Sequence, residues 1–243
     1  MKRQKIRKAL IFILFLLFPV VLYYLSPALI VEGASKGIIT GSFIVFSLLF
    51  ISSLFVGRSY CGWICPGAGL QEACFRISDK RAKGGKFDRI KYFIWVPWMG
   101  IIIFSAIRTG GVHTIKPFFQ TKYGISVAEP ANYPVFYTVI GLITVLSFTA
   151  GKRAFCHYGC WMAPFMVIGT KIRNVFKWPS LHLEANKDKC RSCKTCTKNC
   201  PMSLEVNRMV QKRSMVNSEC ILCGTCVDGC PEGAIEYAFS KRI

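Results

Sequence analysis

The sequence has few acidic residues, few histidines, no motif for covalent haem attachment and no dinucleotide-binding fingerprint. Asp and Glu number 12 against 32 Lys and Arg, which gives a formal net charge of +20. No C-x-x-C-H motif occurs, which excludes covalent c-type haem, and Gly67 and Gly69 do not form a dinucleotide fingerprint. The histidines, His113, His157 and His182, lie outside the long apolar runs. Because a transmembrane haem ladder needs paired histidines in such runs, we expect no haem.

The composition is that of a membrane protein. The chain has 243 residues, of which 52% are hydrophobic, and its mean hydropathy is +0.38. The basic residues flank the apolar runs and do not form one patch interleaved with aromatic residues, so we expect membrane lipid as a partner and no nucleic acid. Twelve of the 13 cysteines lie in close-set groups with ligand spacing, which indicates metal ligation in a reducing compartment.

Four apolar runs without charged residues are long enough to cross a bilayer. They are Ala9 to Leu25, Ile38 to Val56, Tyr92 to Ile107 and Tyr133 to Ala150. The basic start MKRQKIRK also suits a signal peptide, but the apolar core that follows is long for one and favours an uncleaved anchor. The sequence therefore predicts four transmembrane helices.

The distribution of Lys and Arg predicts the orientation. The segments before the first run, between the second and third runs, and after the fourth run hold five, eight and fifteen of these residues. The two remaining loops hold one and three. By the positive-inside rule, we expect a multi-pass protein of the cytoplasmic (inner) membrane with both termini in the cytoplasm.

The C-terminal part carries two cysteine motifs, CRSCKTCTKNCP from Cys190 and CILCGTCVDGCP from Cys220. Each is C-x2-C-x2-C-x3-C-P, the spacing of a bacterial two-cluster ferredoxin, in which the fourth cysteine binds the other motif's cluster. A structural zinc site would not require the third cysteine or the proline. We therefore predict two [4Fe-4S] clusters in an α+β ferredoxin-like domain over residues 181–243. The first is held by Cys190, Cys193, Cys196 and Cys230, and the second by Cys220, Cys223, Cys226 and Cys200.

A second type of cysteine pair follows the second and fourth apolar runs. GRSYCGWICP begins at Gly57 and GKRAFCHYGCW at Gly151, and each contains glycine, a basic residue, an aromatic residue and C-x3-C. We call each C-x3-C segment an elbow. The recurrence predicts that residues 1–180 are a four-helix membrane domain built from two repeated helix pairs, each followed by an elbow and an interfacial helix, over 67–80 and 162–177. The fold class is thus a mainly α membrane protein.

The elbow cysteines are Cys61, Cys65, Cys156 and Cys160. Residues four apart share a helix face, so each elbow can direct two thiols to one place. Packing, a redox disulfide and a metal ion are alternatives, and two matched pairs favour an additional iron–sulfur cluster or metal. Cys74, on the predicted apolar stripe with Leu70, Ala73 and Ile77, is interpreted as a packing residue.

Membrane spans, C-x3-C-P elbows and a C-terminal two-cluster ferredoxin resemble the NapH-type membrane ferredoxins, over nearly the whole chain. The NosR-type regulators and CcoG-type copper reductases have related arrangements. The resemblance implies electron transfer at a membrane, with the NapH type acting as a quinol dehydrogenase subunit. One departure is that Trp161 follows the second elbow where the family pattern has proline.

The leading hypothesis is an iron–sulfur electron-transfer subunit, not a self-sufficient enzyme. It would relay electrons between a quinol, ferredoxin or flavodoxin and a partner redox protein. The alternatives are a metal-ion or small-molecule reductase acting at the elbows and a redox-sensing or maturation factor. The catalytic residues and the direction of electron flow are not encoded in any motif.

Two further groups of residues bear on partners. Lys187, Lys189, Arg191, Lys194 and Lys198 surround the first ferredoxin motif and could steer an acidic ferredoxin, flavodoxin or reductase subunit. Solvation and anionic lipid account for them equally well. In the outer loop, His113 and Glu129 are candidate proton acceptors for a quinone-type carrier, with ordinary loop residues as the alternative.

Overall fold

The computed structural model describes residues 2–241 and is mainly helical. The N-terminal part contains α1 (Lys2–Leu16), α2 (Phe18–Val21), the 3-10 helix η1 (Leu22–Leu25), α3 (Pro27–Ser35), β1 (Ile38–Thr40), α4 (Gly41–Val56), α5 (Ser59–Trp63) and α6 (Pro66–Cys74). The middle part contains η2 (Gly85–Arg89), α7 (Ile90–Arg108), β2 (Thr114–Lys116), η3 (Pro130–Asn132), α8 (Tyr133–Thr149), α9 (Ala154–Tyr158) and α10 (Ala163–Phe176). The C-terminal part contains β3 (Ser180–Ala185), α11 (Thr195–Lys198), α12 (Val206–Gln211), α13 (Thr225–Asp228) and β4 (Ile235–Ser240).

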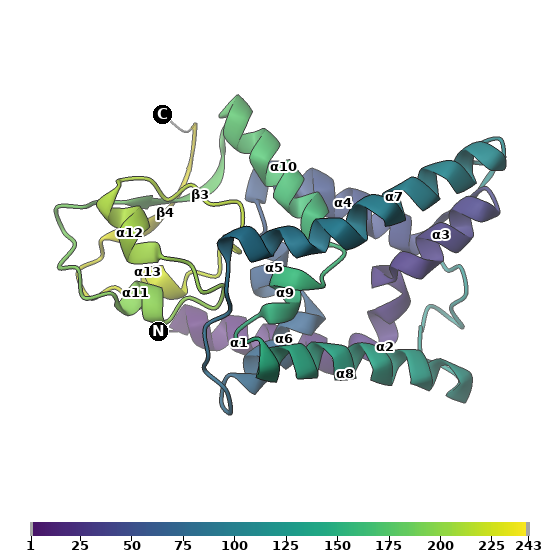
Figure 1. Ribbon diagram of the computed structural model, residues 1–243, viewed down its shortest axis with the longest axis horizontal. Helices are drawn as coiled ribbons and strands as arrows, with labels where there is room; N and C mark the ends of the chain where they lie inside the picture. The colour runs from purple at the N-terminus through teal and green to yellow at the C-terminus, as the bar shows by residue number, and fades with distance from the viewer. Residues whose placement is uncertain (1, 242–243) are drawn as a thin grey trace.

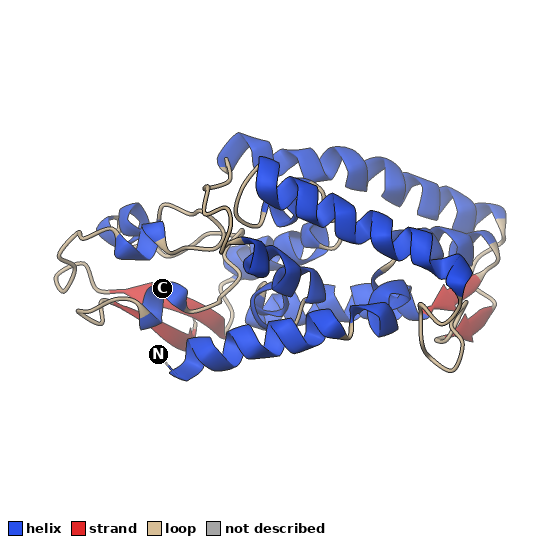
Figure 2. Cartoon of the chain, turned by 90° about the horizontal axis from the view of Figure 1, so that it is seen from below, coloured by secondary structure: helices blue, strands red, loops and turns tan. Residues whose placement is uncertain are grey.

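Two short sheets lie at opposite ends of the molecule, as Figure 2 shows in red. At one end, β3 pairs antiparallel with β4 and forms the sheet of the C-terminal part, beside α11, α12 and α13 (Figure 1). At the other end, β1 pairs in parallel with β2. The strand β1 takes the first three residues of the predicted second span, whereas β2 lies in a loop that was predicted to lie outside. The long helices run between these ends.

Two helical segments, Gly85–Arg108 and Pro130–Thr149, have the length and apolar composition needed to cross a membrane. They contain α7 and α8, and their apolar side chains are widely exposed, for example Phe93 at 79% and Ile107 at 73%. The helix α4 is apolar but shorter, at 16 residues. Two to three candidate spans are thus present by this measure, where the sequence predicts four.

The first predicted span is not one straight helix. It is divided between α1 and the α2–η1 segment, and the two parts meet at 62°. Pro19 stands at the start of α2, where it has no N–H for the i−4 carbonyl of Phe15 and its ring would collide with that carbonyl. Counted as one bent span, this pair is the third candidate.

The helices that follow the elbows are buried between neighbours. After the first elbow, α6 packs between α1 and α8, and after the second, α10 packs along α4. The predicted apolar stripe on the first helix is partly wrong: Cys74 is buried, but Ala73 is exposed and Ile77 is 80% exposed. The reason is that α6 ends at Cys74 and a turn follows, so the helical spacing does not continue to Ile77.

Candidate functional site: three cysteine sets

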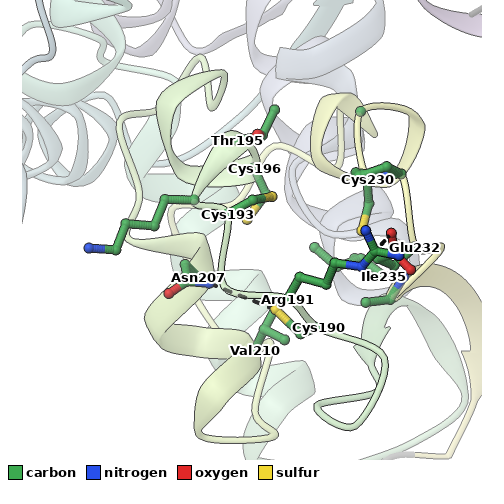
Figure 3. A pocket seen from close by; sticks show the side chains of 14 residues that line it. Cys190, Arg191, Cys193, Thr195, Cys196, Asn207, Val210, Cys230, Glu232 and Ile235 are labelled. Atoms are coloured by element: carbon green, nitrogen blue, oxygen red, sulfur yellow. Dashed lines mark hydrogen bonds and ion pairs between the residues drawn. The ribbon is translucent and has the colours of Figure 1, made fainter.

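The first ferredoxin set, Cys190, Cys193, Cys196 and Cys230, lines one cavity, and its side chains point into the same space (Figure 3). Its first three members come from the loop before α11 and from α11 itself, whereas Cys230 follows α13. Cys193 is exposed, so this set opens to solvent. The fold brings together the four residues predicted to share a cluster.

The second ferredoxin set, Cys200, Cys220, Cys223 and Cys226, lines another cavity. The walls include Leu183, Met202, Met209, Met215 and Ile221, and three of the four cysteines are buried. The second set is therefore shielded from water by apolar side chains, in contrast to the first. Four soft thiol donors around one cavity suit an iron–sulfur cluster in each case.

The two ferredoxin loops have matching backbone conformations. Left-handed φ values occur at Ser192 and Leu222, and again at Lys194 and Gly224, the same positions of the two motifs. A left-handed residue turns the chain sharply, which allows three thiols within seven residues to face one centre. The two motifs therefore fold into the same local loop.

Several N–H groups already point at the ferredoxin sulfurs. The backbone N–H of Ser192 donates to Cys190 Sγ at 3.4 Å, and Asn207 Nδ2 approaches the same sulfur at 3.8 Å. The backbone N–H of Ala234 donates to Cys230 Sγ at 3.3 Å. Hydrogen bonds to the sulfurs of a cluster are among the factors that set its reduction potential.

The elbow cysteines come together from two distant segments. Cys61 lies in α5, Cys65 caps α6, Cys156 lies in α9 and Cys160 follows α9. Each is at most 8% exposed, and all four line one cavity of about 220 Å³. Gln71 Nε2 donates to Cys156 Sγ at 3.3 Å, and Cys61 Sγ lies 3.8 Å from Met166 Sδ.

The cavity extends from the elbow cysteines to apolar side chains of α2, η1 and α8. Its walls include Phe18, Leu22, Leu25, Val139, Ile143 and Trp161. Trp161, which replaces the proline of the family pattern, donates from Nε1 to the Leu25 carbonyl at 2.8 Å and so closes one wall. The elbow cysteines therefore face an apolar space beside a candidate span.

Two buried ion networks flank the elbow cysteines. In one, Glu219 binds Arg58 and, at 2.7 Å, Lys91. In the other, Glu72 binds Arg7 at 2.8 Å and also Arg153. Both arginines nearest the cysteines, Arg58 and Arg153, are 0% exposed. Burial of an unpaired charge is unfavourable in free energy, which explains why each carboxylate pairs with two cations.

The networks fix the ionisation of their carboxylates. Burial alone would raise the pKa of Glu72, but Arg153 and Arg7 outweigh burial and lower that pKa to about 2. Burial likewise opposes ionisation of Glu219, and Arg58 and Lys91 lower its pKa below the usual value. Burial raises the pKa of the Cys61 thiol, and the neighbouring Arg58 and Arg153 act in the opposite direction.

The second ferredoxin set lies directly against the first elbow. Trp63 Nε1 donates to the Leu222 carbonyl at 3.0 Å, and Gln4 Nε2 donates to the Cys223 carbonyl at 2.9 Å. The approach is so close that a Cβ on Gly62 would stand 2.4 Å from the Ile221 carbonyl oxygen. Together with the Arg58–Glu219 contact, these bonds hold the C-terminal part on the elbow.

The candidate proton acceptors are not at this site. His113 Nε2 contacts the Thr109 carbonyl at 2.9 Å, and Glu129 pairs with Lys122 at 3.1 Å, and both residues are exposed in the loop between α7 and α8. Neither is among the described residues that line the elbow cavity. Within residues 2–241, no three His, Cys, Asp or Glu side chains are close enough together to bind one metal ion. A [4Fe-4S] cube needs a wider ring of sulfurs than one ion does, because each thiolate binds a different iron.

Comparison with known families bears on the cofactor. A family described as a 4Fe-4S binding domain matches residues 38–84 and again residues 133–179, and one described as a 4Fe-4S dicluster domain matches residues 189–235. The chain contains 4Fe-4S ferredoxin domains. The two matches of one family each contain an elbow, and the third contains both ferredoxin motifs.

Relatives of this 4Fe-4S protein include an uncharacterized protein of Methanocaldococcus jannaschii, 26% identical over 98% of this chain and 97% of its own length. The putative electron transport protein YccM of Escherichia coli is 24% identical over 83% of this chain and 57% of its own. The regulatory protein NosR of Pseudomonas aeruginosa is 25% identical over 76% of this chain and 25% of its own. No solved structure matches the chain. The predicted relationship to NosR is confirmed, but these relatives do not single out the NapH type.

Sequence reasoning found the cysteines but missed the charged residues around them. Arg58 and Arg153 each stand three residues before the first cysteine of an elbow, so the repeated pattern carried a signal. Glu72 and Glu219 carried none, because each binds cations from segments far away in the sequence.

Proposed function

We propose that this chain is a membrane-anchored iron–sulfur relay, an electron-transfer subunit with a membrane domain of residues 1–180 and a ferredoxin-like domain of residues 181–243. The observation that carries the proposal is the seating of the second ferredoxin set on the first elbow through buried bonds. The elbow cysteines, at the proposed membrane edge, then lie next to a cysteine set of the ferredoxin part. Contact of this kind is what electron transfer between them requires.

The first and second ferredoxin sets hold one [4Fe-4S] cluster each, and the elbow cysteines hold a further site. When bound, such clusters supply one-electron transfer. The protein's own residues set the order of the sites, with the elbow at the membrane, the second set buried in the middle and the first set open to solvent.

On the membrane side, we propose a quinol or quinone as the exchange partner. The elbow cavity continues past the cysteines between apolar side chains such as Phe18, Leu22 and Val139, and a quinol ring would lie at that end, beside the cysteine-bound site. Oxidation of one quinol releases two electrons and two protons and leaves a quinone. The electrons enter the relay one at a time, and the reverse steps apply when the potentials favour reduction of quinone.

On the soluble side, we propose an acidic redox protein, a flavodoxin or ferredoxin, as the partner. Exposed Cys193 marks the open edge of the first set. The surrounding basic side chains, Lys187, Lys189, Arg191, Lys194 and Lys198, are exposed. A positive rim steers a negatively charged partner towards the exposed cofactor edge.

The arrangement in the membrane that we propose has four spans in two repeated pairs. The match of one family to both elbow segments supports the repeat, and α4 and the bent α1–α2–η1 segment would supply the spans beyond α7 and α8. Both termini and all three cysteine sets then lie on the cytoplasmic side, as the Lys and Arg distribution favours.

The test is electron flux across reconstituted protein in lipid nanodiscs, from a quinol to oxidised flavodoxin and from reduced flavodoxin to a quinone. We expect flux in at least one direction and its loss in Cys61→Ser/Cys156→Ser. The matched control is Cys74→Ser, since Cys74 is buried but belongs to no set. Flux that the Cys61→Ser/Cys156→Ser variant retains, or no flux in either direction from protein with full iron, would overturn the relay.

The second candidate function is reduction of a metal ion or small molecule at the elbow. The sulfur-rich surroundings favour it, because Met166 and Met162 stand with the elbow cysteines and thioethers bind soft metal ions. This second function predicts that the isolated protein reduces its substrate with a chemical reductant when no quinol is present.

A further inference from the structure

We propose that the elbow cysteines bind a third [4Fe-4S] cluster and that Arg58 and Arg153 balance its charge and donate hydrogen bonds to it. This inference names the occupant of the elbow and rests on the proposed relay function for the role of that site. The structure supports it through burial, charge and unpartnered donors.

The first argument is charge. Four thiolates carry four negative charges and an oxidised [4Fe-4S] core carries two positive ones, so the assembly has two negative charges. A buried site with that charge requires nearby cations. The elbow cysteines are buried, Arg58 precedes Cys61 by three residues, and Arg153 Nη1 donates to the Cys61 carbonyl at 2.8 Å.

The two ion networks supply the required amount of positive charge. Arg58 and Lys91 face the single carboxylate of Glu219, and Arg7 and Arg153 face that of Glu72. Each network therefore holds one more cation than carboxylate, and the two together balance the oxidised assembly. Asp88 adds a further carboxylate near Lys91, and it pairs with the buried ring of His157, which balances the Asp88 charge when the imidazole is protonated.

The second argument is the unpartnered donors. Nε and Nη2 of Arg58 and Nε of Arg153 are buried and make no hydrogen bond to any residue in 2–241. Buried N–H groups without an acceptor are costly and rare. Arg7 is equally buried but is fully engaged, with Gln4, the Gly62 carbonyl and Glu72. Arg58 and Arg153 therefore keep N–H groups that need an acceptor, and the sulfur atoms of a cluster are suitable acceptors.

The third argument is symmetry. Arg58 precedes Cys61 by three residues, and Arg153 precedes Cys156 by three. In both elbows the arginine lies directly before a short helix, α5 or α9, that carries the first cysteine. Each half of the repeat therefore contributes two thiols and one arginine to the same centre.

The role of the arginines predicts an effect on potential. Reduction adds a third negative charge to the assembly, so a nearby cation stabilises the reduced form more than the oxidised form. Removal of either positive charge should lower the reduction potential. The arginines are positioning and charge-compensating residues and exchange no electrons themselves.

The first experiment measures iron and acid-labile sulfide in anaerobically purified full-length protein. We expect about 12 irons in the wild type and in Cys74→Ser, and about 8 in Cys61→Ser/Cys156→Ser. About 8 irons in all three would overturn the third cluster and leave the two-cluster relay to be judged by the flux assay. Conversely, about 12 irons without quinol-linked flux would support this inference while the proposed function fails.

The second experiment is a redox titration followed by electron paramagnetic resonance. Arg58→Gln leaves Glu219 paired with Lys91, and Arg153→Gln leaves Glu72 paired with Arg7, so neither variant strands a buried carboxylate. At a fixed potential we expect the reduced-to-oxidised ratio of the elbow cluster to fall by about tenfold in each. In Arg58→Lys, which keeps the positive charge, this ratio should fall less.

The matched control is Arg81→Gln, which removes an exposed ion pair with Glu205 that also joins the two parts of the chain. We expect the elbow cluster of Arg81→Gln to show the same reduction potential as that of the wild type. An unchanged elbow signal in both Arg58→Gln and Arg153→Gln, or an equal shift in Arg81→Gln, would overturn the role of the two arginines. If Arg58→Gln or Arg153→Gln instead loses about four irons while the ferredoxin signals stay intact, this result would support the role of the two arginines at the elbow cluster.

Discussion

At the scale of single residues, the crossing of the fourth cysteines is the most informative feature of the C-terminal part. Cys230 lines the cavity of the first three-cysteine loop, and Cys200 lines that of the second. Each cavity thus depends on both motifs, and neither motif encloses a cavity alone. This arrangement is the one that the ferredoxin spacing predicts.

The crossing can be tested with paired substitutions and iron analysis. Cys193→Ala/Cys230→Ala removes two cysteines of one set, so we expect a loss of about four irons, as in either single variant. Cys193→Ala/Cys200→Ala removes one cysteine from each set, so we expect a loss of about eight. The reverse pattern would show that each motif supplies all four ligands of its own cluster.

At the scale of elements, the short helix α5 joins the membrane part to the ferredoxin part. It carries Cys61 towards the elbow cavity on one side and presents Gly62 to the second ferredoxin loop on the other. The first helix, α1, strengthens the same junction, since Arg3 pairs with Asp228 at 2.6 Å and Gln4 binds the Cys223 carbonyl. Three segments distant in sequence thus meet at one point.

Substitution of Gly62 by alanine should separate the two parts without emptying their sites. The new Cβ would stand 2.4 Å from the Ile221 carbonyl oxygen, and backbone must move to relieve the clash. We expect unchanged iron content but a rate of reduction of the ferredoxin sites by quinol that falls by about tenfold or more, measured by stopped flow.

The control is Gly100→Ala in α7, where an added Cβ meets nothing within 4 Å. It should transfer electrons as fast as the wild type. Equal rates in Gly62→Ala and the wild type would mean that the contact at α5 does not limit transfer.

At the scale of the whole molecule, charge and apolar surface are segregated. The helices α7 and α8 carry exposed apolar side chains, such as Phe104 at 64% and Tyr137 at 66%, along the middle of the molecule. The ferredoxin part lies at one end, and the paired strands β1 and β2 lie at the other (Figure 2). This distribution suits a bilayer around the middle with water at both ends.

The proposed orientation predicts which end is reached from outside an intact cell. Tyr123 is 96% exposed in the loop that we propose to be outside. The cysteine of the Tyr123→Cys variant should therefore react with an impermeant maleimide added outside the cell. Lys189→Cys should react only after the membrane is opened. The unmodified protein gives the background of native thiols. Labelling of Lys189→Cys in intact cells would reverse the assignment.

The sequence by itself determined the features that depend on local spacing. The ferredoxin loops take their shape from residues within one motif, so the cysteine sets and the 4Fe-4S class could be predicted from the pattern, and the family matches confirm the class. The position of the elbows after apolar runs was equally local. The bend at Pro19 was also encoded in the sequence, although an uninterrupted apolar run obscured it.

Only the tertiary structure decided how these parts act together. The convergence of the elbow cysteines, the pairing of Glu72 with Arg7 and Arg153, and the seating of Leu222 on Trp63 join residues far apart in the chain. Such contacts depend on packing across the whole molecule, because a buried charge or thiol is stabilised by whichever neighbours the fold supplies. The spacing of cysteines therefore specifies the type of cofactor, and the packing specifies its charge environment and its neighbours.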